Sequence, residues 1–196
     1  RQMCIRDRAF RIVVLASGSG SLLQALLDAE RAGRLPASIV AVGSDREDAH
    51  ALARARDAGI TTFALPLTRG ADRATWDAEL TALVAAHEPD LVVSVGFMKL
   101  LGETFLARFG GRAINSHPAL LPSFPGMHAV RDALAHGVKV TGATVFTIDA
   151  GVDTGEILGQ VAVPVADDDT VETLHERIKV AERELLVRTV TTLAGS

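Results

Sequence analysis

A repeated alternation of short apolar runs with helix-favouring segments constrains the fold of this chain most strongly. The first unit has an apolar run at 11–16, a Gly/Ser turn at 17–21 and a helix-favouring stretch at 22–27. Short apolar runs of this kind are typical of strands buried on both faces of a parallel sheet. The alternation continues with predicted strands at 39–44, 61–64, 91–95 and 112–115 and predicted helices at 49–58 and about 76–84. It predicts an α/β fold with a Rossmann-like, doubly wound, mostly parallel sheet.

The pattern changes after Pro125. A short helix is predicted at 130–136, and two β-rich runs at 139–148 and 157–165 flank an Asp/Gly loop, which we interpret as an antiparallel C-terminal extension of the sheet. Asp169-Thr170-Val171-Glu172 resembles a capping box, and the helix after it has a predicted buried stripe at Leu174, Ile178, Ala181 and Leu185. We expect one domain over residues 11–196, with residues 1–10 a leader or artefact outside the fold.

Composition narrows the classes of function. The chain has 196 residues, of which 48% are hydrophobic and 22% charged, as expected of a packed globule. A net charge of −4 without a basic block disfavours nucleic acid as a partner, and acidic residues interrupt every apolar run before it reaches transmembrane length. The single cysteine, Cys4, excludes a disulfide framework. We expect a cytoplasmic protein that acts on small molecules, as a monomer or a homodimer.

Asn115 and His117 form the first candidate site. In an extended segment their side chains point to the same side, and Pro118 favours extended geometry at His117. An amide donor beside a proton carrier suits attack on a carbonyl carbon. The alternative is a strand that runs into a proline-rich loop, and these residues alone do not decide between the two.

A glycine turn and an acidic loop are the next candidates. The turn at 18–21 lies between a predicted strand and helix, where backbone amides and the helix dipole can bind an anion. It is not a full dinucleotide fingerprint, because Leu23 stands where the third glycine is needed, and a simple tight turn is the alternative. Asp149 and Asp153 also suit turn chemistry. If the fold brings Asp153 to His117, its carboxylate would stabilise the protonated imidazole.

The remaining polar residues give weaker signals. His117, His128 and His136 do not have the spacing of a metal-binding helix pair, and no zinc motif is present, so we predict no metal. Lys179 and Glu182 stand three residues apart on the last predicted helix and can share a face. A surface ion pair is the alternative for these two.

These motifs occur together in one family. The stretch 115–122 (NSHPALLP), followed by Phe124-Pro125-Gly126, resembles the signature of the phosphoribosylglycinamide formyltransferases, also called glycinamide ribonucleotide transformylases. The stretch 142–155 is similar to their second signature, 17–24 to their phosphate loop, and 96–101 to their folate-contacting segment. The resemblance extends over about residues 11–193.

The resemblance implies formyl transfer from 10-formyltetrahydrofolate, the co-substrate, to the amine of glycinamide ribonucleotide in purine synthesis, without a metal. It implies that Asn115 donates to the developing oxyanion, that His117 is the general acid and that Asp153 supports the charged imidazole. The ribonucleotide would be bound by Gly20, Ser21, Leu22, Lys179 and Glu182. The folate would be bound by Arg73, Met98, Lys99, Leu100, Leu101, Asn115 and Ile148.

The chain departs from the family pattern at three positions. Leu22 stands where many relatives have Asn, Phe146 where many have His, and Lys99 where Arg is common. The rival functions are a methionyl-tRNA or sugar-nucleotide formyltransferase, a formyltetrahydrofolate deformylase, and a non-catalytic nucleotide-binding module. The glycine turn and Phe124-Pro125-Gly126 favour the ribonucleotide enzyme.

Overall fold

A computed structural model describes residues 8–195, and their strands form one seven-stranded sheet in the order β3-β2-β1-β4-β5-β6-β7. The strands are β1 Phe10–Leu15, β2 Ala37–Ser44, β3 Thr61–Ala64, β4 Leu91–Ser94, β5 Ala113–His117, β6 Val140–Thr147 and β7 Ile157–Pro164. Strands β1 to β5 pair in parallel, whereas β6 is antiparallel to both β5 and β7. The predicted fold, with its antiparallel extension, is therefore confirmed.

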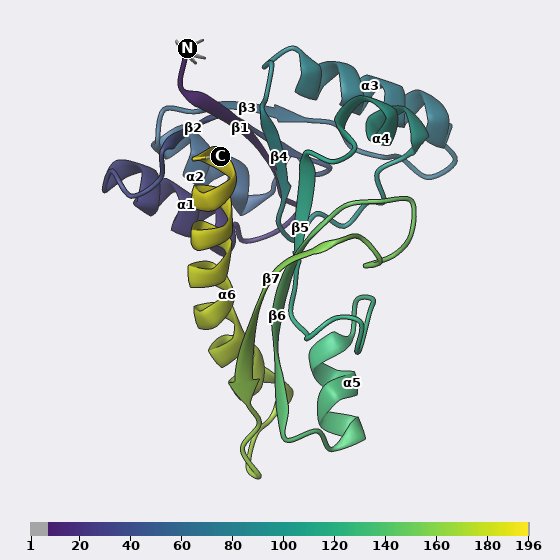
Figure 1. Cartoon of the computed structure of the whole chain (residues 1–196). Coiled ribbons are helices and arrows are strands. Elements are labelled where there is room, and N and C mark those ends of the chain that lie inside the picture. Colours follow the sequence, from purple (N-terminus) through teal and green to yellow (C-terminus); the bar gives the residue numbers. More distant parts are fainter. Residues whose placement is uncertain (1–7, 196) are drawn as a thin grey trace, which may run out of the picture.

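Helices cover both faces of the sheet (Figure 1). They are α1 Ser21–Arg31, α2 His50–Asp57, α3 Arg73–Ala85, α4 Glu103–Phe109, α5 Ala129–His136 and α6 Val171–Ala194. Strand β1 shows why two layers form, because its successive side chains point to opposite faces and are all apolar. Ile12 and Val14 join the core formed with α1, α2 and α6, while Val13 and Leu15 join the core formed with α3 and α4.

Three local details differ from the expectations. Helix α4 was not predicted from the sequence. The capping box of α6 is formed by Thr170 and Thr173, one residue later than expected, because Asp169 makes other contacts. Strand β1 begins at Phe10, which packs against the core. The expected leader lies largely in residues 1–7, outside the described residues.

The sheet topology fixes where a ligand can bind. Strand β1 pairs with β2 on one side and with β4 on the other, so the order of the chain reverses beside β1. Open α/β sheets bind ligands at the carboxyl ends of the strands that flank such a reversal. The segments that follow β1 and β4, including the glycine turn and residues 96–101, therefore meet at this point. No helix within residues 8–195 is long and apolar enough to cross a membrane.

Candidate active site

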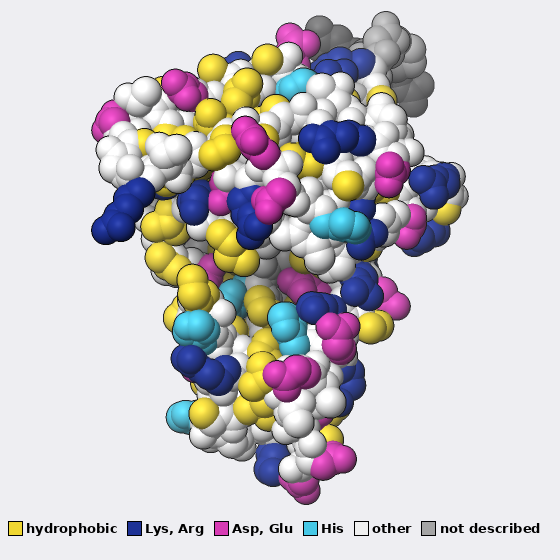
Figure 2. Space-filling view, turned by 180° about the vertical axis from the view of Figure 1, so that it is seen from behind, with side chains coloured by type: hydrophobic (Ala, Val, Ile, Leu, Met, Phe, Trp, Pro, Cys, Tyr) yellow, Lys and Arg dark blue, Asp and Glu magenta, His cyan; other side chains and the backbone are white. Residues whose placement is uncertain are grey.

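A cavity of about 630 Å³ lies at the carboxyl edge of the sheet. Its walls come from the segments after β1, β4 and β5, the loop between β6 and β7, and one face of α6. The space-filling view in Figure 2 shows this side of the molecule hollowed below its broad upper part, with acidic and histidine side chains beside the hollow. The cavity therefore draws on segments that are far apart in the sequence.

Asn115 and His117 both lie on β5 and line the cavity, as their spacing predicts. The imidazole of His117 is held on two sides: Nε2 lies 2.8 Å from the carbonyl oxygen of Phe124, and Nδ1 lies 3.5 Å from Oδ2 of Asp153. A carbonyl oxygen can only accept, so Nε2 carries a proton and Nδ1 faces the carboxylate. A second proton on Nδ1 would therefore face a negative charge. Within residues 8–195, the Asn115 carboxamide has no side-chain hydrogen bond and is available to a ligand.

Asp153 reaches His117 from the loop between β6 and β7. Its carboxylate accepts a hydrogen bond of 2.7 Å from the backbone amide of Gly126. Its backbone has a φ of 55°, in the left-handed region that Asp tolerates better than most residues. The segment 124–126 thus contacts both members of the pair, because Phe124 binds the imidazole and Gly126 binds the carboxylate.

Ser116 points to the opposite face of β5, towards α6. Its hydroxyl donates to Oε1 of Glu182 over 2.5 Å, and both side chains are buried. Burial raises the pKa of Glu182, while the hydrogen bond from Ser116 and the charge of His117 partly offset this rise. Lys179 also lines the cavity but pairs with Glu176 at 2.7 Å rather than with Glu182. Lys179 and Glu182 therefore both line the cavity, as their spacing predicts, but they do not form an ion pair with each other.

The glycine turn also lines the cavity, with Gly20, Ser21 and Leu22 in its wall. Gly20 has a φ of 73°, and a Cβ there would lie 2.8 Å from the Cα of Ala51, so a side chain does not fit. Arg54 donates to the carbonyl of Ser19 over 2.8 Å and so holds the turn against α2. No side chain caps the start of α1, so its first amides are free to bind an anion.

The segment after β4, which the sequence predicts to contact folate, forms one wall of the cavity. Met98 and Leu100 are 66% and 64% exposed and line the cavity together with Leu101 and Ile148. Arg73 is not part of the lining: its guanidinium donates to the carbonyl of Leu100 over 2.7 Å and lies over the ring of Trp76. Arg73 thus supports the segment from the side of α3.

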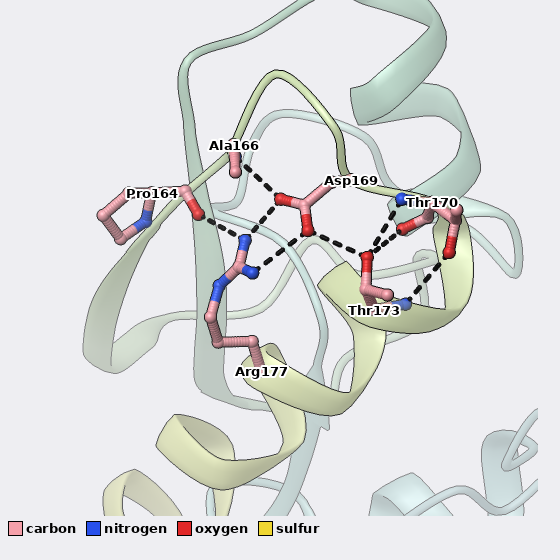
Figure 3. Close-up of polar contacts among 6 residues, drawn as sticks. All are labelled: Pro164, Ala166, Asp169, Thr170, Thr173 and Arg177. Carbon is pink, nitrogen blue, oxygen red and sulfur yellow. Dashed lines mark hydrogen bonds and ion pairs between the residues drawn. The ribbon is translucent and has the colours of Figure 1, made fainter.

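The first turns of α6 are held by a polar cluster, shown in Figure 3. The carboxylate of Asp169 accepts hydrogen bonds from the amide of Ala166, the hydroxyl of Thr173 and the guanidinium of Arg177. The contact with Arg177 holds the pKa of Asp169 well below its usual range. Thr170 and Thr173 complete the reciprocal cap. This anchor sets the position of the helix that carries Lys179 and Glu182.

Several residues of the cavity region were not singled out from the sequence. His175 lines the cavity one turn before Lys179, and burial followed by the charge of Lys179 lowers its pKa. A periodicity of four on the last helix would have indicated it. Ser116 could have been placed by strand alternation, but its partner lies 66 residues away. Among residues 8–195, no group of three or more His, Cys, Asp or Glu could hold a metal ion.

An amide, an imidazole and a carboxylate in one cavity at the carboxyl edge of an α/β sheet define a candidate group-transfer enzyme. The chain matches the model described as "Formyl transferase" over residues 10–190. It therefore belongs to the formyl transferase family.

The similar proteins point to one branch of this family. The chain is 61% identical over 184 residues to the phosphoribosylglycinamide formyltransferase of Mycobacterium tuberculosis (strain ATCC 25618 / H37Rv), covering 94% of this chain and 85% of that protein. It is 38% identical to the enzyme of the same name from Escherichia coli (strain K12), over 89% of this chain and 82% of that one. The crystal structure of glycinamide ribonucleotide transformylase 1 from Symbiobacterium toebii matches with a TM-score of 0.94 and 43% identity, covering 100% and 92% of the two chains.

Proposed function

We propose that this enzyme transfers the formyl group of 10-formyltetrahydrofolate to the amine of glycinamide ribonucleotide, in de novo purine synthesis. The products are formylglycinamide ribonucleotide and tetrahydrofolate. The observation that carries the proposal is one cavity lined by a glycine turn at an uncapped helix start, an apolar wall and the set Asn115, His117 and Asp153. A phosphorylated amine and a flat, largely apolar formyl donor match these three parts.

The chemistry begins when the amine attacks the formyl carbon and negative charge grows on the formyl oxygen. In our proposal the Asn115 carboxamide and the protonated His117 imidazole both donate to that oxygen. Donors that are already in position stabilise the transition state without reorganisation, and each is typically worth about 100-fold or more in rate. The hydrogen bond from His117 to Phe124 would be exchanged for one to the substrate, because Nε2 has only one proton to donate.

The tetrahedral intermediate then collapses to the products. The bond between the formyl carbon and N10 of the folate breaks, and its electron pair goes to N10. N10 gains one proton and the attacking nitrogen loses one, so the transfer is balanced without an added acid or base. We assign this proton movement to His117, and Asp153 supports its charged form from 3.5 Å.

Binding roles follow from the chemistry of the lining. The amides at Gly20, Ser21 and Leu22 would hold the phosphate, with the dipole of α1 favouring its charge. Lys179 and Glu182 would contact the rest of the ribonucleotide from α6. The apolar side chains of Met98, Leu100, Leu101 and Ile148 would contact the folate, with Lys99 beside them. Arg73 would support this wall from outside the cavity, through the carbonyl of Leu100.

Steady-state turnover with both substrates tests this function. Purified protein should convert glycinamide ribonucleotide to its formylated product, identified by mass spectrometry, with one tetrahydrofolate released per product. Release of formate without formylated ribonucleotide would instead indicate a deformylase. Tight binding of either ligand without turnover would indicate a non-catalytic module.

A further inference from the structure

Asp45 carries a buried carboxylate near the cavity that has no role in the proposed mechanism. Asp45 directly follows β2, and the residue is only 6% exposed. Its Oδ1 accepts a hydrogen bond of 2.5 Å from the hydroxyl of Ser17, and its Oδ2 lies 3.3 Å from Nζ of Lys99. A carboxylate is costly to bury unless it is paired and hydrogen-bonded, and these two contacts meet that need.

The contacts of Asp45 close into a ring. The amide of Met98 donates to the hydroxyl oxygen of Ser17 over 2.8 Å, and Met98 is the neighbour of Lys99 in the chain. Ser17, Asp45, Lys99 and the backbone of Met98 therefore form a closed polar ring. The ring joins the segments that follow β1, β2 and β4 at the carboxyl edge of the sheet. The amide of Ser17 also donates to the carbonyl of Gly96 over 3.1 Å, which adds a second tie between the same segments.

The polar ring holds the backbone of the cavity wall and leaves its apolar side chains facing the ligand space. Met98 and Leu100 remain 66% and 64% exposed in the cavity lining. On the other side of this segment, Arg73 binds the carbonyl of Leu100, and the ring of Phe97 stacks on Trp76 at 6.4 Å. A wall that is already held on both sides does not have to become ordered when a ligand binds. Ligand binding then costs less conformational entropy, which favours affinity.

We infer that Asp45 is a positioning residue for the folate co-substrate, acting through Ser17 and Lys99 on the wall at 98–101. This inference rests on the proposed function, since Asp45 is inferred to hold one wall of the proposed folate site. The ammonium group of Lys99 then serves mainly as the partner of Asp45 and only indirectly as a folate contact.

Asp45→Asn tests the inference with little change in size. The carboxamide oxygen can still accept from Ser17, but the charge that holds Lys99 is lost. The KM for 10-formyltetrahydrofolate should rise by about tenfold or more, as expected when a ligand wall shifts slightly. The KM for glycinamide ribonucleotide should change little, since the new carboxamide still accepts from Ser17 and Arg54 also holds the glycine turn through the carbonyl of Ser19. Anaerobic calorimetry with tetrahydrofolate should show the same weakening.

Asp48→Asn is the matched control, because Asp48 follows the same strand and pairs with Arg46 on the exposed surface. Its kinetics should equal those of the unmodified enzyme. If Asp45→Asn lowers only Tm and leaves the folate KM unchanged, Asp45 is merely structural and the inference fails. If Asp45→Asn does not fold, Ser17→Ala must raise the folate KM instead, and an unchanged value would overturn the inference.

A double-mutant cycle with Lys99→Met separates support from direct contact. If Lys99 acts through the ring, Lys99→Met should add little to the folate KM of Asp45→Asn. If Lys99→Met raises the folate KM equally in the unmodified enzyme and in Asp45→Asn, Lys99 contacts the folate independently of Asp45. That result would overturn the inference that the polar ring acts as one unit. Failure of the proposed function would look different, because the unmodified enzyme would then neither turn over nor bind tetrahydrofolate.

Discussion

At the scale of single residues, the contact between His117 and Asp153 makes the sharpest prediction. Asp153→Asn should lower kcat by about 100-fold or more, because a neutral amide no longer stabilises the charged imidazole. The variant should keep its Tm, since Asn can also accept the hydrogen bond from the amide of Gly126. Steady-state rates and a thermal melt measure the two effects.

Asp167→Asn is the control for that substitution, because Asp167 pairs with Lys139 on the exposed surface. It should retain full activity. Activity of Asp153→Asn close to that of the unmodified enzyme would remove Asp153 from the mechanism and leave its contact with His117 a structural one.

Glu182 gives a prediction about pH. Burial raises the pKa of Glu182 in the folded protein, so the folded state favours the protonated form. Its contribution to stability is then fully present below the unfolded pKa of about 4.3 and is lost as pH rises through the higher folded pKa. Glu182→Gln should therefore be more stable than the unmodified protein at pH 7.5, with the difference shrinking towards pH 4.5.

Thermal melts across this pH range measure the effect, and Glu176→Gln on the exposed surface of the same helix is the control. The same Glu182→Gln change should raise the KM for the ribonucleotide by roughly tenfold, because a contact to a charged acceptor is lost. If Glu182→Gln is less stable than the unmodified protein at every pH, the prediction is wrong. That result would show that the hydrogen bond from Ser116 compensates for the cost of burying the Glu182 carboxylate.

At the scale of elements, the anchored start of α6 determines where the cavity-facing residues lie. Thr170→Ala removes the side chain that accepts from the amide of Thr173. The free energy of unfolding should fall by about 1 kcal/mol, the usual cost of losing a helix cap. Thr191→Ala, at the other end of α6, removes a hydroxyl that donates to the carbonyl of Val187 in the preceding turn and, over 3.5 Å, to the carbonyl of Arg34, and it should cost less. Urea denaturation compares the two, and equal losses would contradict a special role for the cap.

Elements were predictable where the signal is local. The apolar and β-branched runs predicted all seven strands of the described sheet to within about two residues, because the signal for each strand lies in its own residues. Helix α4 was missed because its start depends on a distant residue. The carboxylate of Asp77, 25 positions earlier than Gly102, accepts from the amides of Gly102 and Phe105. Such a cap leaves no pattern in the helix itself.

The site residues also divide into those with a local signal in the sequence and those without one. Asn115, His117 and Asp153 stand in recognisable motifs, and the structure brings all three to one cavity. The partners Asp45 and Ser17 are 28 residues apart and are joined only by the order of the strands. Only the fold could show that the two side chains meet.

At the scale of the whole molecule, the proposed function assigns two ligands to separate parts of one cavity, so each should stabilise the protein independently. A ligand at 100 times its Kd stabilises the folded state by about 2.7 kcal/mol, or roughly 5–10 °C in Tm for a domain of this size. Glycinamide ribonucleotide and tetrahydrofolate should each give such a shift with the unmodified protein.

Gly20→Ala should abolish the ribonucleotide shift and keep the tetrahydrofolate shift. The added Cβ would lie 2.8 Å from the Cα of Ala51 and displace the glycine turn that we assign to the phosphate. Gly33→Ala is the matched control, since Gly33 has a similar φ of 68° but open space around it. It should lose some stability through backbone strain and keep both ligand shifts. A full ribonucleotide shift in Gly20→Ala would show that the phosphate binds elsewhere in the cavity.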